Sequence, residues 1–179
     1  NNEVYASVAG IEFENSRHGV IENNLVYDNA GGILTFITPG LPIKTTYDLI
    51  IRNNFITNNN HKNFGAPGSM VSGVPSGTGI VIMAADEVTM ENNIISGNKN
   101  TGIIITDHDS FPNITRDPET DPKSDKIAIL NNVMYNNGYE PIDEIKALKV
   151  ATLTSDDVYI VNVGNSRESC ILNRDQYVS

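Results

Sequence analysis

Ile50-Ile51-Arg52-Asn53-Asn54-Phe55-Ile56 is one of four copies of a short phrase in which an apolar segment meets an Asn-Asn pair. The other copies lie at 20–26, 89–95 and 129–134. A second phrase, which starts with glycine and continues with mostly apolar residues, occurs at 10–13, 32–35, 79–82 and 102–105. Strand-like phrases that recur at a short period of roughly 22 residues are typical of a β-solenoid, whose coils bury apolar side chains against their neighbours.

The asparagines themselves recur with a constant offset. The second residue of each pair forms one set, and another set follows it five positions later in every case: Asn24, Asn54, Asn93 and Asn132, then Asn29, Asn59, Asn98 and Asn137. Because stacked strands lie about 4.8 Å apart, we expect the first set to form a hydrogen-bonded amide ladder along the axis. Asn and Gly tolerate left-handed backbone angles, so we expect both to mark the corners of each coil.

The spacing between repeats varies because three stretches interrupt them, at 39–47, 61–78 and 110–125. Long insertions in a solenoid are expected to gather on one face and build its working surface. After Gly138 the pattern weakens: 141–148 predicts one or two helical turns, 157–163 a strand, and 166–179 a last imperfect coil or a cover. We therefore predict one all-β domain over 1–179 with about six or seven coils, clear repeats at 10–138 and an irregular C-terminal coil or cap at 139–179.

Composition excludes several classes of protein. The net charge of −10 argues against a nucleic-acid partner, which requires clustered Lys and Arg, and suits an exported protein or a cation-binding surface. The single cysteine, Cys170, rules out an internal disulfide. No apolar run approaches the roughly 20 residues of a membrane span. Repeats begin at Gly10 with no capping helix before it, so we expect a longer precursor, and open ends permit end-to-end or side-by-side self-association.

The phrases Glu22-Asn23-Asn24-Leu25, Glu91-Asn92-Asn93-Ile94 and Gly102-Ile103-Ile104-Ile105 resemble the right-handed parallel β-helix repeats of the pectin-lyase-like superfamily. The stretch 73–86 is similar to a bacterial family of exported β-helix-repeat proteins with no established activity. This resemblance implies a right-handed parallel β-helix and a location outside the cell, in the periplasm or on the outer surface. A leucine-rich-repeat solenoid is the alternative fold, but its leucine spacing and helical return are missing.

The superfamily includes polysaccharide lyases and mannuronan epimerases, and the candidate catalytic residues follow from this class. Asp107, His108 and Asp109 directly follow a predicted strand, and Asp86 lies one coil earlier. Two carboxylates around an imidazole can supply the base and the acid that remove the C5 proton of a uronic acid. In an extended segment their side chains alternate, so they converge only if the chain turns there.

Two further sets are candidates for binding. Arg52, His61 and Lys62 are basic residues near the repeats that would neutralise an acidic sugar. Asp117, Glu119, Asp121 and Asp125 place carboxylates at alternating positions, and hard oxygen ligands of this kind suit Ca²⁺, the one cofactor that the sequence suggests. A polar loop with no ligand is the alternative for each set.

Two classes of function remain open from the sequence. The first is an exported, non-enzymatic β-helix that binds glycans or a surface protein partner. The alternative is a lyase or epimerase that acts on an acidic, uronate-containing polysaccharide. No complete catalytic motif is present, so the sequence favours the binding module. Convergence of the acids and a basic residue on one point would favour the enzyme.

Overall fold

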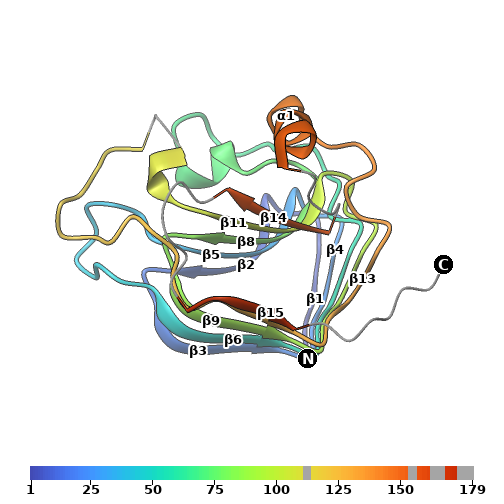
Figure 1. Cartoon of the computed structure of the whole chain (residues 1–179), viewed down its shortest axis with the longest axis horizontal. Coiled ribbons are helices and arrows are strands. Elements are labelled where there is room, and N and C mark those ends of the chain that lie inside the picture. Colours follow the sequence, from blue (N-terminus) through green and yellow to red (C-terminus); the bar gives the residue numbers. More distant parts are fainter. Residues whose placement is uncertain (111–113, 153–156, 162–167, 173–179) are drawn as a thin grey trace.

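A computed structural model describes residues 1–110, 114–152, 157–161 and 168–172 of the chain. In this part, parallel strands form three sheets with five strands each, and successive strands of the chain pass from one sheet to the next (Figure 1). The chain is therefore a parallel β-helix, as the repeats predict. Within the described ranges the strands of the three sheets make five coils, fewer than the six or seven expected.

Each sheet contains the strands that occupy the same position in successive coils. Sheet A holds the short strands after the Asn-Asn pairs, which are β1 (Glu3–Val4), β4 (Leu25–Tyr27), β7 (Phe55–Thr57), β10 (Ile94–Ser96) and β13 (Val133–Tyr135). Sheet B holds the four glycine-led strands, which are β2 (Ala9–Glu14), β5 (Gly31–Phe36), β8 (Thr78–Met83) and β11 (Thr101–Thr106), together with β14 (Val158–Val161), which contains no glycine. Sheet C holds the four strands before the Asn-Asn pairs, which are β3 (Arg17–Glu22), β6 (Tyr47–Arg52), β9 (Asp86–Glu91) and β12 (Ala128–Leu130), together with β15 (Cys170–Leu172), which precedes no such pair.

The core is a column of aliphatic side chains that stack from coil to coil. In sheet C, Ile21 is paired with Ile51, which is paired with Met90, and all three are buried. Sheets A and B add equivalent rows to the same cluster. This in-register stacking removes each apolar side chain from water without needing long-range sequence complementarity, so similar residues at a fixed period are sufficient to build it.

The amide ladder that the asparagine spacing predicts is present. The Asn24 side-chain amide donates to Asn54 Oδ1 at 2.9 Å, Asn54 donates to Asn93 at 3.0 Å, and Asn93 donates to Asn132 at 2.9 Å. The second set forms a parallel ladder. Asn29 donates to Asn59 at 2.9 Å, Asn59 donates to Asn98 at 3.1 Å, and Asn98 donates to Asn137 at 3.0 Å. Buried amides whose polar atoms are satisfied in this way fix the register of the coils.

The asparagines and glycines of the coils meet different physical needs. The left-handed backbone expected of both is present at the corner residue Gly97, with φ of 66°, but not at the glycines that lead the strands of sheet B. The first asparagine of each pair has a left-handed backbone, with φ of 55° at Asn53 and 54° at Asn92. Gly32 and Gly79 do not. A Cβ on Gly79 would lie 2.5 Å from the Gly102 carbonyl oxygen, and one on Gly32 would lie 2.4 Å from the Gly79 oxygen. Glycine is required there because the next coil is too close for a side chain.

The C-terminal region keeps the expected order of elements. Ile145 of the helix α1 (Asp143–Thr152) and Ile142, just before the helix, pack against Ile104 on the outer side of β11. The strands β14 and β15 then continue sheets B and C by pairing with β11 and β12. Residues 162–167 and 173–179, parts of the predicted strand and last coil, lie outside the described residues. In the part that the structure describes, no helix has the length and apolar character needed to cross a membrane.

The insertions leave the column at two corners and meet over one sheet. Residues 37–46 and 107–127 connect sheet B to sheet C, and residues 58–77 connect sheet A to sheet B. The second and third of these contain the short 3-10 helices η2 (His108–Ser110) and η1 (Met70–Gly73), respectively. Both turns lie beside the outer face of sheet B in Figure 1. The expected single working face is therefore the outer face of this sheet.

Candidate functional site

Asp107 begins the 107–127 insertion and is fully buried. Its Oδ1 accepts hydrogen bonds from the backbone N–H of Ser110 at 2.9 Å and from the Ser110 hydroxyl at 2.6 Å. These contacts are typical of a side chain that caps a helical turn, here η2, and satisfies its first N–H groups. The carboxylate of Asp107 therefore stabilises the turn η2, which follows β11.

His108 points into the protein and is only 5% exposed. Its Nε2 donates to the carbonyl oxygen of Ile37 at 2.9 Å, and its backbone N–H donates to the Pro122 carbonyl at 2.9 Å. Because a carbonyl can only accept, Nε2 carries the proton. Burial lowers the pKa of His108 from its usual value, so the ring is neutral. The imidazole connects the long insertion to the first one, which starts at Ile37.

Asp109 and Asp86 point to separate partners. Asp109 forms an ion pair with Arg116 at 2.7 Å. Asp86, at the start of β9, accepts the backbone N–H of Asp125 at 2.8 Å, and burial followed by nearby acids raises its pKa. The side chain of Asp86 thus contacts the end of the 107–127 insertion, at Asp125. Asp107 lies at the other end of that insertion, directly after β11 of sheet B. The structure does not bring the four candidate catalytic residues to one point.

The three candidate basic residues lie in two separate parts of the fold. Arg52 is at the end of β6 in sheet C and forms an ion pair with Glu22 at 2.8 Å. His61 and Lys62 lie in the insertion that joins sheets A and B, where His61 Nδ1 is 2.9 Å from the Lys62 carbonyl oxygen and its ring contacts Phe64. These residues form no common basic pocket with the acids of the long insertion.

The four candidate calcium ligands lie in one loop, the 107–127 insertion, but contact different groups of the protein. Asp117 Oδ2 accepts Lys44 Nζ at 2.6 Å and the Gly40 N–H at 2.9 Å, and Glu119 lies 3.6 Å from the same lysine. Asp121 accepts the Lys123 N–H at 3.0 Å. The Lys44 hydrogen bond holds the pKa of Asp117 at about 2. Within the described ranges, no three His, Cys, Asp or Glu side chains are grouped so that they would hold a metal ion.

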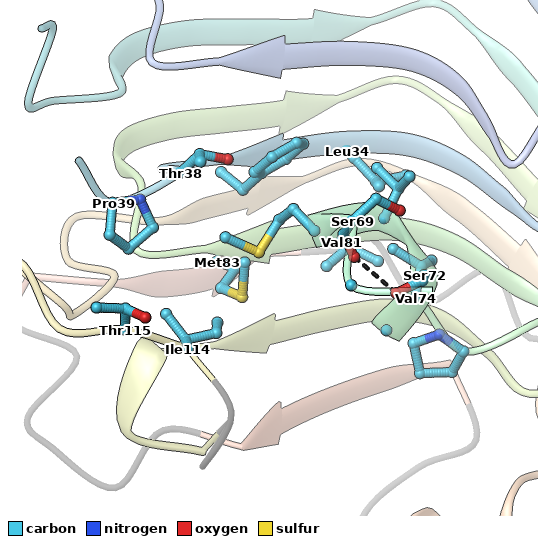
Figure 2. A pocket seen from close by; sticks show the side chains of 16 residues that line it. Leu34, Thr38, Pro39, Ser69, Ser72, Val74, Val81, Met83, Ile114 and Thr115 are labelled. Atoms are coloured by element: carbon cyan, nitrogen blue, oxygen red, sulfur yellow. Dashed lines mark hydrogen bonds between the residues drawn. The ribbon is translucent and has the colours of Figure 1, made fainter. Parts of the chain in front are cut away.

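A cleft of about 480 Å³ lies on the outer face of sheet B (Figure 2). Its floor is formed by Leu34 and Phe36 of β5 together with Val81 and Met83 of β8. All three insertions contribute to its walls, in chain order through Thr38 and Pro39, through 68–75, and through Ile114 and Thr115. We call this space the sheet B cleft. It is where segments far apart in the sequence come together.

Specific contacts hold the walls of the cleft in place. The Asn63 side-chain amide donates to the carbonyls of Val71 at 2.9 Å and Val74 at 2.8 Å, which fixes the segment around η1. The Lys44–Asp117 pair connects the other two insertions. Backbone carbonyls and N–H groups in such loops need partners when water is excluded, and these side chains supply them.

Sequence reasoning missed the floor of the cleft, although a signal was present. In sheet C, polar and apolar residues alternate, as expected for a strand with one face in water. In β5 and β8 every residue is buried, and the run Ile80-Val81-Ile82-Met83 shows no alternation. A continuous apolar run indicates a strand that is covered on both faces. That signal marks the part of sheet B over which the insertions fold.

The chain was compared with known proteins to find its family. Searches among curated proteins and among solved structures gave no match. A family model described as a right handed beta helix region matches residues 1–117. This range includes the first three rungs, the strand β11 and most of the described insertions that form the cleft. The chain therefore belongs to the right-handed β-helix family.

Proposed function

We propose that this chain is a non-enzymatic binding module of an exported β-helix protein and that it binds its ligand, at the cell surface, in the sheet B cleft. The observation that carries the proposal is the convergence of all three insertions over one sheet, where they enclose a cleft of about 480 Å³. Pockets of roughly 300–1,000 Å³ with a mainly apolar lining are typical of ligand sites.

The positions of the polar residues support binding over chemistry. A general base must reach the proton that it removes, within roughly 3 Å of a plausible substrate position. Asp107 caps η2, and the proton of His108 Nε2 is directed to a backbone carbonyl inside the protein. Both residues serve the architecture of the insertion. Action on an acidic polysaccharide, with or without Ca²⁺, is the competing proposal.

An NMR time course separates the two proposals. The protein is incubated with alginate, with pectate and with a neutral glycan, each in Ca²⁺ and in chelator, so that elimination, epimerisation and hydrolysis are followed together. We expect unchanged covalent structures for every polymer. New anomeric or unsaturated signals that disappear with His108→Gln would overturn the binding proposal and establish an enzyme. A circular-dichroism spectrum of the variant shows whether it is folded.

The same samples test where binding occurs. Gly73 lines the cleft, and a Cβ built on it meets no atom within 4 Å, so Gly73→Phe adds a bulky side chain to the cleft wall without a clash at its Cβ. If a glycan is the target, its resonances broaden with the wild type and recover with Gly73→Phe. Broadening that persists with this variant would place the glycan elsewhere on the molecule.

A further inference from the structure

We infer that the sheet B cleft binds one small, neutral, apolar molecule, an inference that rests on the proposed binding function and names its ligand class. None of the described residues that line the cleft carries a charge, although the chain as a whole has a net charge of −10. The floor residues Leu34, Val81 and Met83 and the wall residues Met70 and Ile114 present hydrocarbon or thioether groups. A ligand with the same apolar character would gain most from leaving water here.

Three of the four hydroxyl groups in the lining donate hydrogen bonds to other groups of the protein, namely those of Thr38, Ser69 and Ser72. Ser69 Oγ donates to the Ala66 carbonyl at 2.8 Å, and Ser72 Oγ donates to the Ser69 carbonyl at 2.6 Å. The Thr38 hydroxyl donates to the carboxylate of Glu14. A sugar would lose water from many hydroxyls and find few free donors in return, which is costly. These three hydroxyls therefore disfavour a polar ligand.

Charge around the cleft disfavours an anion. Strand register places Glu12 beside Leu34 and Glu14 beside Phe36, so two carboxylates on β2 border the floor. Burial, followed by the charge of Glu14, raises the pKa of Glu12. The nearest ion pair between insertions, Lys44 with Asp117, leaves that lysine already neutralised. An anionic head group would meet repulsion from the glutamates with no free cation in the described lining to offset it.

Size and adaptability complete the ligand class. A cleft of about 480 Å³ accommodates a single compact molecule of a few rings or a short chain. Met70 in the wall and Met83 in the floor have flexible thioether side chains that adapt to ligands of irregular shape. The cleft is therefore suited to a class of apolar compounds more than to one rigid shape.

Two fluorescent probes with the same aromatic body test the charge requirement. N-phenyl-1-naphthylamine is neutral, and 8-anilinonaphthalene-1-sulfonate carries an added sulfonate. We expect saturable binding of the neutral probe at one site per folded chain, and binding of the sulfonate weaker by at least roughly tenfold. Absence of saturable binding of the neutral probe, or equal affinity for the two probes, would overturn the inference.

Variants place the probe in the cleft. Val81→Glu puts a carboxylate on the floor, and Gly73→Phe adds a bulky side chain to the wall, at a position where a Cβ meets no atom within 4 Å. Val20→Glu is the matched control, because Val20 is 49% exposed on β3 of sheet C, outside the cleft. We expect both cleft variants to weaken binding at least roughly tenfold and the control to leave it unchanged. Equal affinity in all three variants would refute the site.

The outcomes distinguish this inference from the proposed function. If the neutral probe does not bind but a glycan binds in a manner that Gly73→Phe abolishes, the ligand class is wrong and the binding module stands. If polymers are chemically altered, the proposed function fails regardless of the probe result.

Discussion

The corner between sheets C and A and the corner between sheets B and C belong to the same coils but behave differently. The first is an Asn-Asn pair in all four coils, as at Asn53-Asn54 and Asn92-Asn93, with no insertion. The second is two residues long after β2 and β8 but expands to 37–46 after β5 and 107–127 after β11. Figure 1 shows the uniform turns closely stacked and the long loops extending away from the column.

The two corners differ in how their polar groups find hydrogen-bond partners. At the uniform corner, the partner of each amide is the same residue in the next coil, so a change at Asn93 breaks contacts with Asn54 and Asn132 together. At the variable corner, polar groups are satisfied by individual side chains, such as His108 for the Ile37 carbonyl. Because those contacts do not repeat, this corner can carry insertions and a cleft.

The largest effect is expected from breaking the uniform corner in its middle. Asn93→Ala removes an acceptor for Asn54 N and Nδ2 and donors to Ile51 and Asn132, all buried. With about 1 kcal/mol per hydrogen bond and a further cost for unsatisfied groups, we expect unfolding free energy to fall by about 4 kcal/mol in urea titrations. Asn2→Ala, at the exposed first rung, is the control and should cost under about 1 kcal/mol. Equal costs would show that ladder position is irrelevant.

A second variant tests close packing at the glycine-led strands. Gly79→Ala places a Cβ 2.5 Å from the Gly102 carbonyl oxygen, whereas at Gly73 no atom lies within 4 Å. We expect Gly79→Ala to lower the unfolding free energy by about 2–3 kcal/mol through overpacking. Gly73→Ala should stay within about 0.5 kcal/mol of the wild type in thermal and urea unfolding. A neutral result at Gly79 would contradict the steric explanation of the glycine positions.

At the variable corner, His108 predicts a dependence on pH. Burial lowers its pKa below the unfolded value of 6.5, so the unfolded chain binds more protons as the pH falls below that value. The wild type should therefore lose stability on acidification through about pH 6.5, and His108→Gln should lose less over the same range. At neutral pH the variant should cost about 1 kcal/mol for the contact with Ile37. Parallel pH profiles for the two proteins would refute this role.

The smallest effect is expected at the Lys44–Asp117 pair, which connects two insertions. The lysine hydrogen bond lowers the pKa of Asp117 from 3.8 to about 2, so its stabilising contribution is complete above pH 3.8 and is lost as the pH falls towards 2. Asp117→Asn should thus be less stable than wild type near neutrality and match it near pH 2, as urea unfolding would reveal. A constant difference across this range would contradict it.

Much of the fold is predictable from the sequence because its contacts repeat. Asn54 and Asn93 have the same neighbours one coil away, so their periodic spacing alone indicates a ladder. The candidate catalytic and calcium-binding residues lack this property. His108 is held by Ile37, which is 71 positions away, and Asp117 is held by Lys44, 73 positions away. No local pattern in the sequence indicates those partners. Residues whose types and spacing suggested catalysis or metal binding therefore make structural contacts instead.

The parallel β-helix, its asparagine ladders and the positions of the three insertions follow from the amino-acid sequence alone, because periodic residues report contacts between equivalent positions. The folding of the insertions over sheet B, the contacts by which Asp107 and His108 hold the loop, and the cleft floor of Leu34, Val81 and Met83 are visible only in the folded chain. These arrangements depend on single contacts between segments far apart in the chain. Each such contact occurs once, so it leaves no repeat in the sequence from which it can be read.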